Sequence, residues 1–254
     1  MRLVEILTTG IEILDDALGG GLLEDSNLLI LYDAYSYGWS LAFEIMRNRM
    51  GMGDFGVIVD SILPLSSLEM ELGGINFDLK REGEAGNLAI LDIFSSFYGI
   101  KYPEAFVYTD QSIDESTFLP KYLLMYRRAL REIIGDRRPV GVDATLDGMA
   151  FLLGEDNFIR ILQRLMAVKE EARLTEKRKR PLNIWLMNKG RVSEKLISWM
   201  AVYSHYVIEF HSSEDSFEER MFVRKSPLPG FKSREGGYRF RLDNGRIKLR
   251  PFSQ

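Results

Sequence analysis

Cysteine is absent from the 254 residues, and histidine is nearly so. Without thiols the chain has no disulfide bonds and no thiolate metal ligands, which is typical of an intracellular protein. The two histidines, His205 and His211, have no cluster of carboxylates around them in the sequence, so no metal site is predicted. No hydrophobic run approaches the ~18 residues of a membrane span, and the amino terminus lacks a signal-peptide pattern. We therefore expect a cytoplasmic protein without a membrane partner.

The composition is that of one compact domain. Hydrophobic residues make up 46% of the chain, which is enough for a large core, and we predict a single domain over residues 1–254. Charged residues make up 28%, whereas glutamine occurs only three times, a balance that favours a thermophilic origin. The G-x-S-x-G pattern of serine hydrolases does not occur, so no nucleophilic triad is nominated.

Apolar segments of strand length alternate with segments of helical periodicity, which predicts an α/β fold with a largely parallel central sheet. The chain should end in a β-hairpin, because Tyr238–Leu242 and Arg246–Arg250 flank an Asn-Gly turn signal. One long stretch, Ser95–Phe118, reads as irregular, either as a lid or binding loop or, the interpretation we favour, as a surface insertion. The expected strands before the hairpin are Asn27–Tyr32, Gly56–Val59, Leu88–Leu91, Val140–Val142, Leu182–Met187, Tyr206–Phe210 and Glu219–Arg224. The expected helices are Leu41–Met50, Leu65–Leu72, Pro120–Ile134, Asp156–Leu174 and Arg191–Tyr203.

The segment after the first expected core strand resembles a phosphate-binding loop that has lost its chemistry. It aligns with the motif G-x-x-x-x-G-K-[ST] without a gap, and two motif positions are kept, by Gly38 and Ser40. The first glycine has become Asp33, which would repel a phosphate, and the lysine has become Trp39, which removes a positive charge. Rings crowd the same loop, so we predict that it is plugged by Asp33, Tyr35, Tyr37 and Trp39.

The residues before this loop carry a family resemblance. The run Thr8-Thr9-Gly10-Ile11-Glu12-Ile13-Leu14-Asp15-Asp16-Ala17-Leu18-Gly19-Gly20-Gly21 resembles the lead-in of KaiC-like and RadA/RecA-type ATPases. Residues 138–145 look like their Walker B strand, in which Asp143 is the counterpart of the magnesium-holding aspartate, and residues 225–245 are similar to the RadA end. The resemblance implies a RecA-like three-layer P-loop NTPase fold. More narrowly, the chain resembles an uncharacterised KaiC-like family of hyperthermophilic archaea, from the Pyrococcus and Thermococcus group.

Two further elements of that family are altered. The glutamate pair that follows the second core strand is replaced by Asp60-Ser61, and a shorter side chain there is misplaced for activating water. The Lys-x-Arg pair that reaches a neighbouring γ-phosphate is reduced to Lys225-Ser226-Pro227. The phosphate-binding loop, the glutamate pair and the Lys-x-Arg pair are thus all altered together. We therefore interpret the chain as a pseudo-ATPase without catalytic residues, and we expect no ATP or magnesium cofactor.

Charge is distributed unevenly along the chain. Residues 220–250 contain ten lysines and arginines against two carboxylates, although the whole chain has a net charge of −4. Period-two alternation should gather five of these cations on one hairpin face: Arg239, Arg241, Arg246, Lys248 and Arg250. Such a face could meet an acidic partner, the acidic body of a second copy, or nucleic acid, or it could simply be solvated.

Three functions therefore remain open. The interpretation we favour is a protein- or peptide-interaction scaffold, including self-association into a homo-oligomer, because RecA-like cores assemble side by side and bind peptides at sheet edges. One alternative is a nucleotide-binding regulator with weak or no hydrolysis, using Gly38, Ser40, Asp143 and a basic residue such as Lys189 or Lys225. The second alternative is nucleic-acid binding through the basic hairpin.

Overall fold

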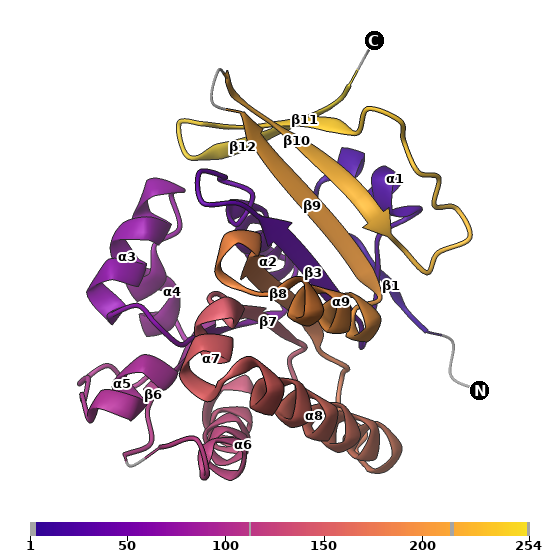
Figure 1. Ribbon diagram of the computed structural model, residues 1–254. Helices are drawn as coiled ribbons and strands as arrows, with labels where there is room; N and C mark the ends of the chain where they lie inside the picture. The colour runs from indigo at the N-terminus through magenta and orange to yellow at the C-terminus, as the bar shows by residue number, and fades with distance from the viewer. Residues whose placement is uncertain (1–3, 112, 214–215, 253–254) are drawn as a thin grey trace.

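The computed structural model describes residues 4–111, 113–213 and 216–252 (Figure 1). Its strands are β1 (Ile6–Leu7), β2 (Leu22–Leu23), β3 (Asn27–Tyr32), β4 (Phe55–Asp60), β5 (Leu88–Asp92), β6 (Val107–Tyr108), β7 (Pro139–Asp143), β8 (Leu182–Asn188), β9 (Tyr206–Ser213), β10 (Ser216–Lys225), β11 (Tyr238–Asp243) and β12 (Arg246–Pro251). Its α-helices are α1 (Glu12–Leu18), α2 (Ser40–Gly51), α3 (Leu65–Gly74), α4 (Leu79–Glu84), α5 (Ile93–Tyr98), α6 (Phe118–Ala129), α7 (Leu146–Leu153), α8 (Glu155–Thr175) and α9 (Glu194–Tyr203). A π-helical turn at Leu130–Ile134 continues α6, and a 3-10 turn occupies Lys189–Arg191.

A ten-stranded sheet organises the molecule, in the order β12-β11-β10-β9-β3-β8-β7-β4-β5-β6. The strands from β9 to β6 are parallel, whereas β10, β11 and β12 are added antiparallel at one edge. The hairpin turn has the left-handed backbone that a type I′ turn requires, with φ of 50° at Asn244 and 70° at Gly245. The largely parallel sheet and the terminal hairpin confirm the predicted fold class.

Helices cover both faces of the sheet, which gives three layers. Buried side chains of α1 to α4 form one core with alternate strand residues such as Leu28, Ile30 and Ile58. The intervening residues, such as Leu29 and Val57, face a second core with α5 to α9. Every residue of β3 and β4 is buried, because a central parallel strand is covered on both sides. No helix within the described ranges is long and apolar enough to cross a lipid bilayer.

The structure corrects the expectation that Ser95–Phe118 is irregular throughout. Helix α5 extends into this stretch as far as Tyr98, and β6 adds a short edge strand beside β5. Asp92 begins α5 by accepting a hydrogen bond from the Ser95 amide at 2.7 Å. A six-residue helix and a two-residue strand are too short for periodicity to reveal them.

Candidate site: a phosphate-type loop closed by internal carboxylates

The loop between β3 and α2 keeps the position of a phosphate-binding loop but not its free donors. In such a loop several backbone amides converge on a bound anion. Here the Tyr35 amide donates to Asp33 Oδ1 at 3.1 Å, and the Ser36 amide donates to the Asp33 carbonyl at 3.2 Å. The Gly38 amide donates to Ser36 Oγ at 2.9 Å, and the Ser40 amide donates to the Tyr37 carbonyl at 2.9 Å. These donors are therefore satisfied within the loop itself.

A further acceptor in the loop comes from β10, far away in sequence. Glu219 is only 5% exposed, and its Oε1 accepts a hydrogen bond from the Tyr37 amide at 2.6 Å. Its Oε2 accepts from the Ser36 hydroxyl. Burial raises the pKa of Glu219, although the hydrogen bonds from Ser36 and Tyr37 oppose that rise. A carboxylate of the chain thus makes contacts that a phosphate oxygen would make in a working loop.

Asp33 fastens the other side of the loop to β9. Its Oδ2 accepts from the Ser212 amide at 2.9 Å, and its Oδ1 accepts from the Ser212 hydroxyl. Burial acts to raise the pKa of Asp33, but the hydrogen bonds from Ser212 and Tyr35 and the charge of Lys189 outweigh it, so the pKa lies below its ordinary value. Asp33, which was predicted to repel phosphate, is therefore ionised and connects the end of β3 to β9 through its hydrogen bonds with Ser212.

The structure separates the four residues that were predicted to plug the loop. Tyr35 is 83% exposed and Tyr37 is 52% exposed, so their rings face solvent and do not fill an interior site. Trp39 is half-buried and meets Phe43 edge-on, with 6.0 Å between the ring centroids. Asp33 and Trp39 thus contact the rest of the fold, and the loop contact that sequence reasoning missed is the one from Glu219.

The three residues predicted to hold a nucleotide do not face one site. Gly38 lies against the ring of Phe210, and Ser40 Oγ donates to the Tyr37 carbonyl at 2.7 Å. Asp143 ends β7, and its carboxyl lies among the rings beneath α6, where the Trp185 indole donates to it. Burial raises the pKa of Asp143 to about 7. Because α2 packs on the opposite face of the sheet, Asp143 is directed away from the helix that Ser40 begins.

The other groups proposed for nucleotide chemistry have structural partners. Asp60 is 1% exposed and accepts from the Leu63 amide at 3.2 Å and from the Thr145 hydroxyl at 3.3 Å; burial raises its pKa to about 6. Lys225 donates to two carbonyls at the end of α9, and Lys189 pairs with Glu209 at 2.8 Å. No cluster of three metal-ligating side chains occurs among the residues that the structure describes.

The hairpin places its cations on one exposed face. Arg239 lies opposite Arg250 in the β11–β12 register, and Arg241 lies opposite Lys248. These four residues and Arg246 are exposed, whereas Phe240 and Leu249 are buried against the core. Lys248 pairs with Asp243, and Arg239 approaches Glu218 at 3.5 Å. Among the described residues, carboxylates pair with two of these five cations, so most of the positive charge on this face is not neutralised.

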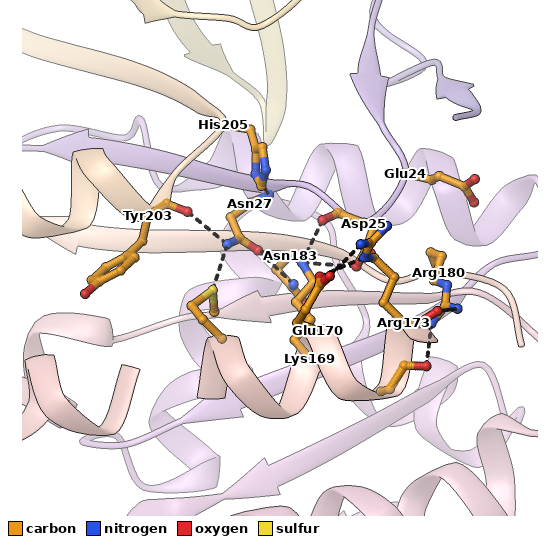
Figure 2. Close-up of polar contacts among 12 residues, drawn as sticks. Glu24, Asp25, Asn27, Lys169, Glu170, Arg173, Arg180, Asn183, Tyr203 and His205 are labelled. Carbon is orange, nitrogen blue, oxygen red and sulfur yellow. Dashed lines mark hydrogen bonds and ion pairs between the residues drawn. The ribbon is translucent and has the colours of Figure 1, made fainter. Parts of the chain in front are cut away.

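A second polar cluster lies at the amino ends of β3 and β8, where α8 passes (Figure 2). Asn27 accepts from Lys169 at 3.1 Å and from Asn183 at 3.0 Å, and its own amide group donates to the Tyr203 carbonyl at 3.0 Å. Lys169 also pairs with Asp25 at 3.2 Å. Burial lowers the pKa of Lys169, and Asp25 opposes that shift. Sequence reasoning missed this cluster, in which Asp25 and Asn27 meet side chains and carbonyls more than a hundred residues further along the chain.

Comparison with known proteins identifies the fold. No known protein family matches the chain, and no curated protein matches it. Among solved structures, an uncharacterized protein of Pyrococcus horikoshii in complex with an unknown peptide is similar over 97% of this chain and 100% of its own, with 22% identity and a TM-score of 0.81. A KaiC-like protein of P. horikoshii is similar over 98% of this chain and 100% of its own, with 17% identity and a TM-score of 0.72. The chain therefore has a KaiC-like, RecA-type fold, as its lead-in sequence predicts.

Proposed function

We propose that this protein is a non-hydrolysing RecA-type scaffold that binds a protein or peptide partner. The observation that carries the proposal is the Glu219 carboxylate, which accepts hydrogen bonds from the Tyr37 amide and the Ser36 hydroxyl inside the former phosphate loop. A magnesium nucleotide does not fit the residues present. The loop has no lysine, two carboxylates occupy its donors, and Asp143 lies on the other face of the sheet.

The partner class is supported by the similar Pyrococcus structure, which contains an unknown peptide. A fold that keeps its sheet, both helical layers and its hairpin while closing its nucleotide loop retains surfaces for association. Self-association is part of the proposal, because the basic hairpin of one copy and the acidic remainder of another are complementary in charge.

Isothermal titration calorimetry with ATP and magnesium, combined with a phosphate-release assay, tests the loss of nucleotide function. We expect no binding at micromolar nucleotide and no release above the rate without protein. Micromolar binding with turnover would overturn the proposal. Micromolar binding without turnover would instead favour the nucleotide-regulator alternative.

A second candidate function is nucleic-acid binding, and the continuous cationic hairpin face favours it. If five cations contact phosphates of a single strand, affinity should fall about 100-fold between ~50 and ~200 mM salt. Fluorescence anisotropy with a labelled 20-nucleotide single strand measures this slope. Replacing Arg241 and Lys248 by serine should flatten it, whereas the same change at the exposed Lys177 and Lys179 removes equal charge elsewhere and should not. Equal effects of the two pairs would count against the hairpin.

A further inference from the structure

A cavity of about 360 Å³ lies between α6, α8 and the strands β4, β7 and β8, on the sheet face opposite α2. This volume is within the range of small-ligand sites. Figure 1 shows α6 and α8 at the end of the molecule remote from the hairpin. Five aromatic side chains line the cavity: Phe118, Tyr122, Tyr126, Phe158 and Trp185. The cavity is therefore separate from the closed loop and from the basic face.

Strand β7 provides a floor with open space beside an ionisable carboxyl group. A Cβ added to Gly141 would meet only Asn183 Oδ1 at 3.4 Å and a carbonyl at 3.9 Å, so a side chain could occupy the space that this glycine leaves. Glycine weakens a central strand, and it is common where a ligand approaches the backbone closely. Two residues further along the strand, Asp143 presents a carboxyl group to the same cavity, beside Trp185.

Ion-paired side chains of both signs line the mouth. Lys169, Asp25 and Asn183 line it and belong to the hydrogen-bonded cluster of Figure 2, which fixes their positions. Arg178 also lines it. Its Nε pairs with Glu176 at 2.8 Å, while its Nη1 is buried without a hydrogen-bond partner among the described residues. A buried donor of this kind is satisfied when a ligand oxygen reaches it.

We propose that this cavity binds the amino-terminal end of a peptide whose first side chain is apolar, an assignment that rests on the proposed scaffold function. The α-ammonium pairs with Asp143 at the floor, where aromatic faces also attract a cation. The first side chain packs among the rings, and the backbone carbonyl of a following residue accepts from Arg178. A peptide amino terminus presents this order of charge, with the cation innermost and the oxygens behind it.

Immobilised protein challenged with tetrapeptides tests the assignment. The probe is a mixture of peptides X-Ala-Glu-Gly with varied first residue, offered either with a free or with an acetylated amino terminus, and retention is measured by mass spectrometry. We expect peptides with apolar or aromatic first residues to be retained at least tenfold over their acetylated forms. Free leucine at the same concentration should not displace them, and displacement would overturn the peptide assignment in favour of an amino acid.

Two variants and a matched control locate the site. Asp143→Asn should reduce retention at least tenfold, and Gly141→Val, which fills the floor, should abolish it while leaving the melting temperature unchanged or higher. Asp60→Asn replaces a buried aspartate that lies outside the cavity and should retain peptides as the wild type does. If acetylation and both cavity variants leave the retention of the peptides unchanged, this assignment is overturned. The proposed scaffold function is not tested by that result. No retention of any tetrapeptide would also overturn the assignment. The loss of nucleotide function is tested separately, by the titration with ATP and magnesium.

Discussion

Replacing Asp143 by asparagine is expected to change how the stability of the protein depends on pH. Burial raises the pKa of Asp143 from its ordinary 3.8 to about 7, although the Trp185 indole opposes the shift. A carboxyl group whose pKa is higher in the folded chain stabilises the fold below its unfolded pKa, and this contribution is lost as the pH rises through the folded pKa. For Asp143 the loss extends from about pH 4 to about pH 7.

The size of the effect follows from the shift. Each pKa unit corresponds to about 1.4 kcal/mol, so a shift of roughly three units sets a ceiling of about 4 kcal/mol. Water that enters the cavity reduces the penalty of ionising Asp143, and we expect about 2–4 kcal/mol. Asparagine does not ionise. The unfolding free energy of the variant minus that of the wild type should therefore increase by this amount as the pH rises from 4 to 8.

Urea unfolding at pH 4, 6 and 8, followed by far-UV circular dichroism, measures the change. Asp16→Asn, which replaces an exposed aspartate on α1, serves as the control for removing one carboxylate, and its stability difference from the wild type should change with pH much less. Parallel pH profiles for the wild type and Asp143→Asn would refute the reasoning, since they would mean that the Asp143 carboxyl is solvated like an exposed one.

Two further predictions concern the closed loop. Glu219→Ala leaves the Tyr37 amide and the Ser36 hydroxyl without their acceptor and should lower the free energy of unfolding by about 1–3 kcal/mol in urea titrations, whereas Glu218→Ala, on the exposed face of the same strand, should change it by less than about 0.5 kcal/mol; equal effects would argue against the carboxylate closure. Gly38→Ala would place its Cβ 2.4 Å from the Phe210 ring and should cost about 1–3 kcal/mol by the same assay. Gly51→Ala, with open space around it in α2, is the matched control, and a neutral Gly38→Ala would show that Phe210 can move aside.

The sequence predicted the fold well because the signals for its elements depend only on neighbouring residues. The glycine-rich lead-in, the apolar runs of β3 and β4 and the Asn-Gly turn each act within a few residues, and all of them correspond to observed elements. Helix α7 went unpredicted because it is apolar around most of its surface and contains Gly148, where a Cβ would lie 2.3 Å from Ile62.

The candidate site was predicted only in part, because its decisive contact is long-range. The sequence reveals the missing lysine, but Glu219 meets Tyr37 across 182 residues. One signal was available: Glu219 shares strand parity with Met221 and Val223, both buried, so a carboxylate on the inward face needed a buried partner. Likewise Asp143 was placed correctly at a strand end, while the direction of its carboxyl depends on which face of β7 it occupies.

The most direct test of the account is the backbone amide spectrum of the loop. In 1H–15N correlation spectra, the Tyr37 and Gly38 resonances report whether an added anion reaches these donors. With Glu219 and Ser36 as their acceptors, we predict that millimolar ATP with magnesium leaves both resonances unchanged. A saturable shift of the two resonances together would contradict the account, because it would show a loop that still binds phosphate.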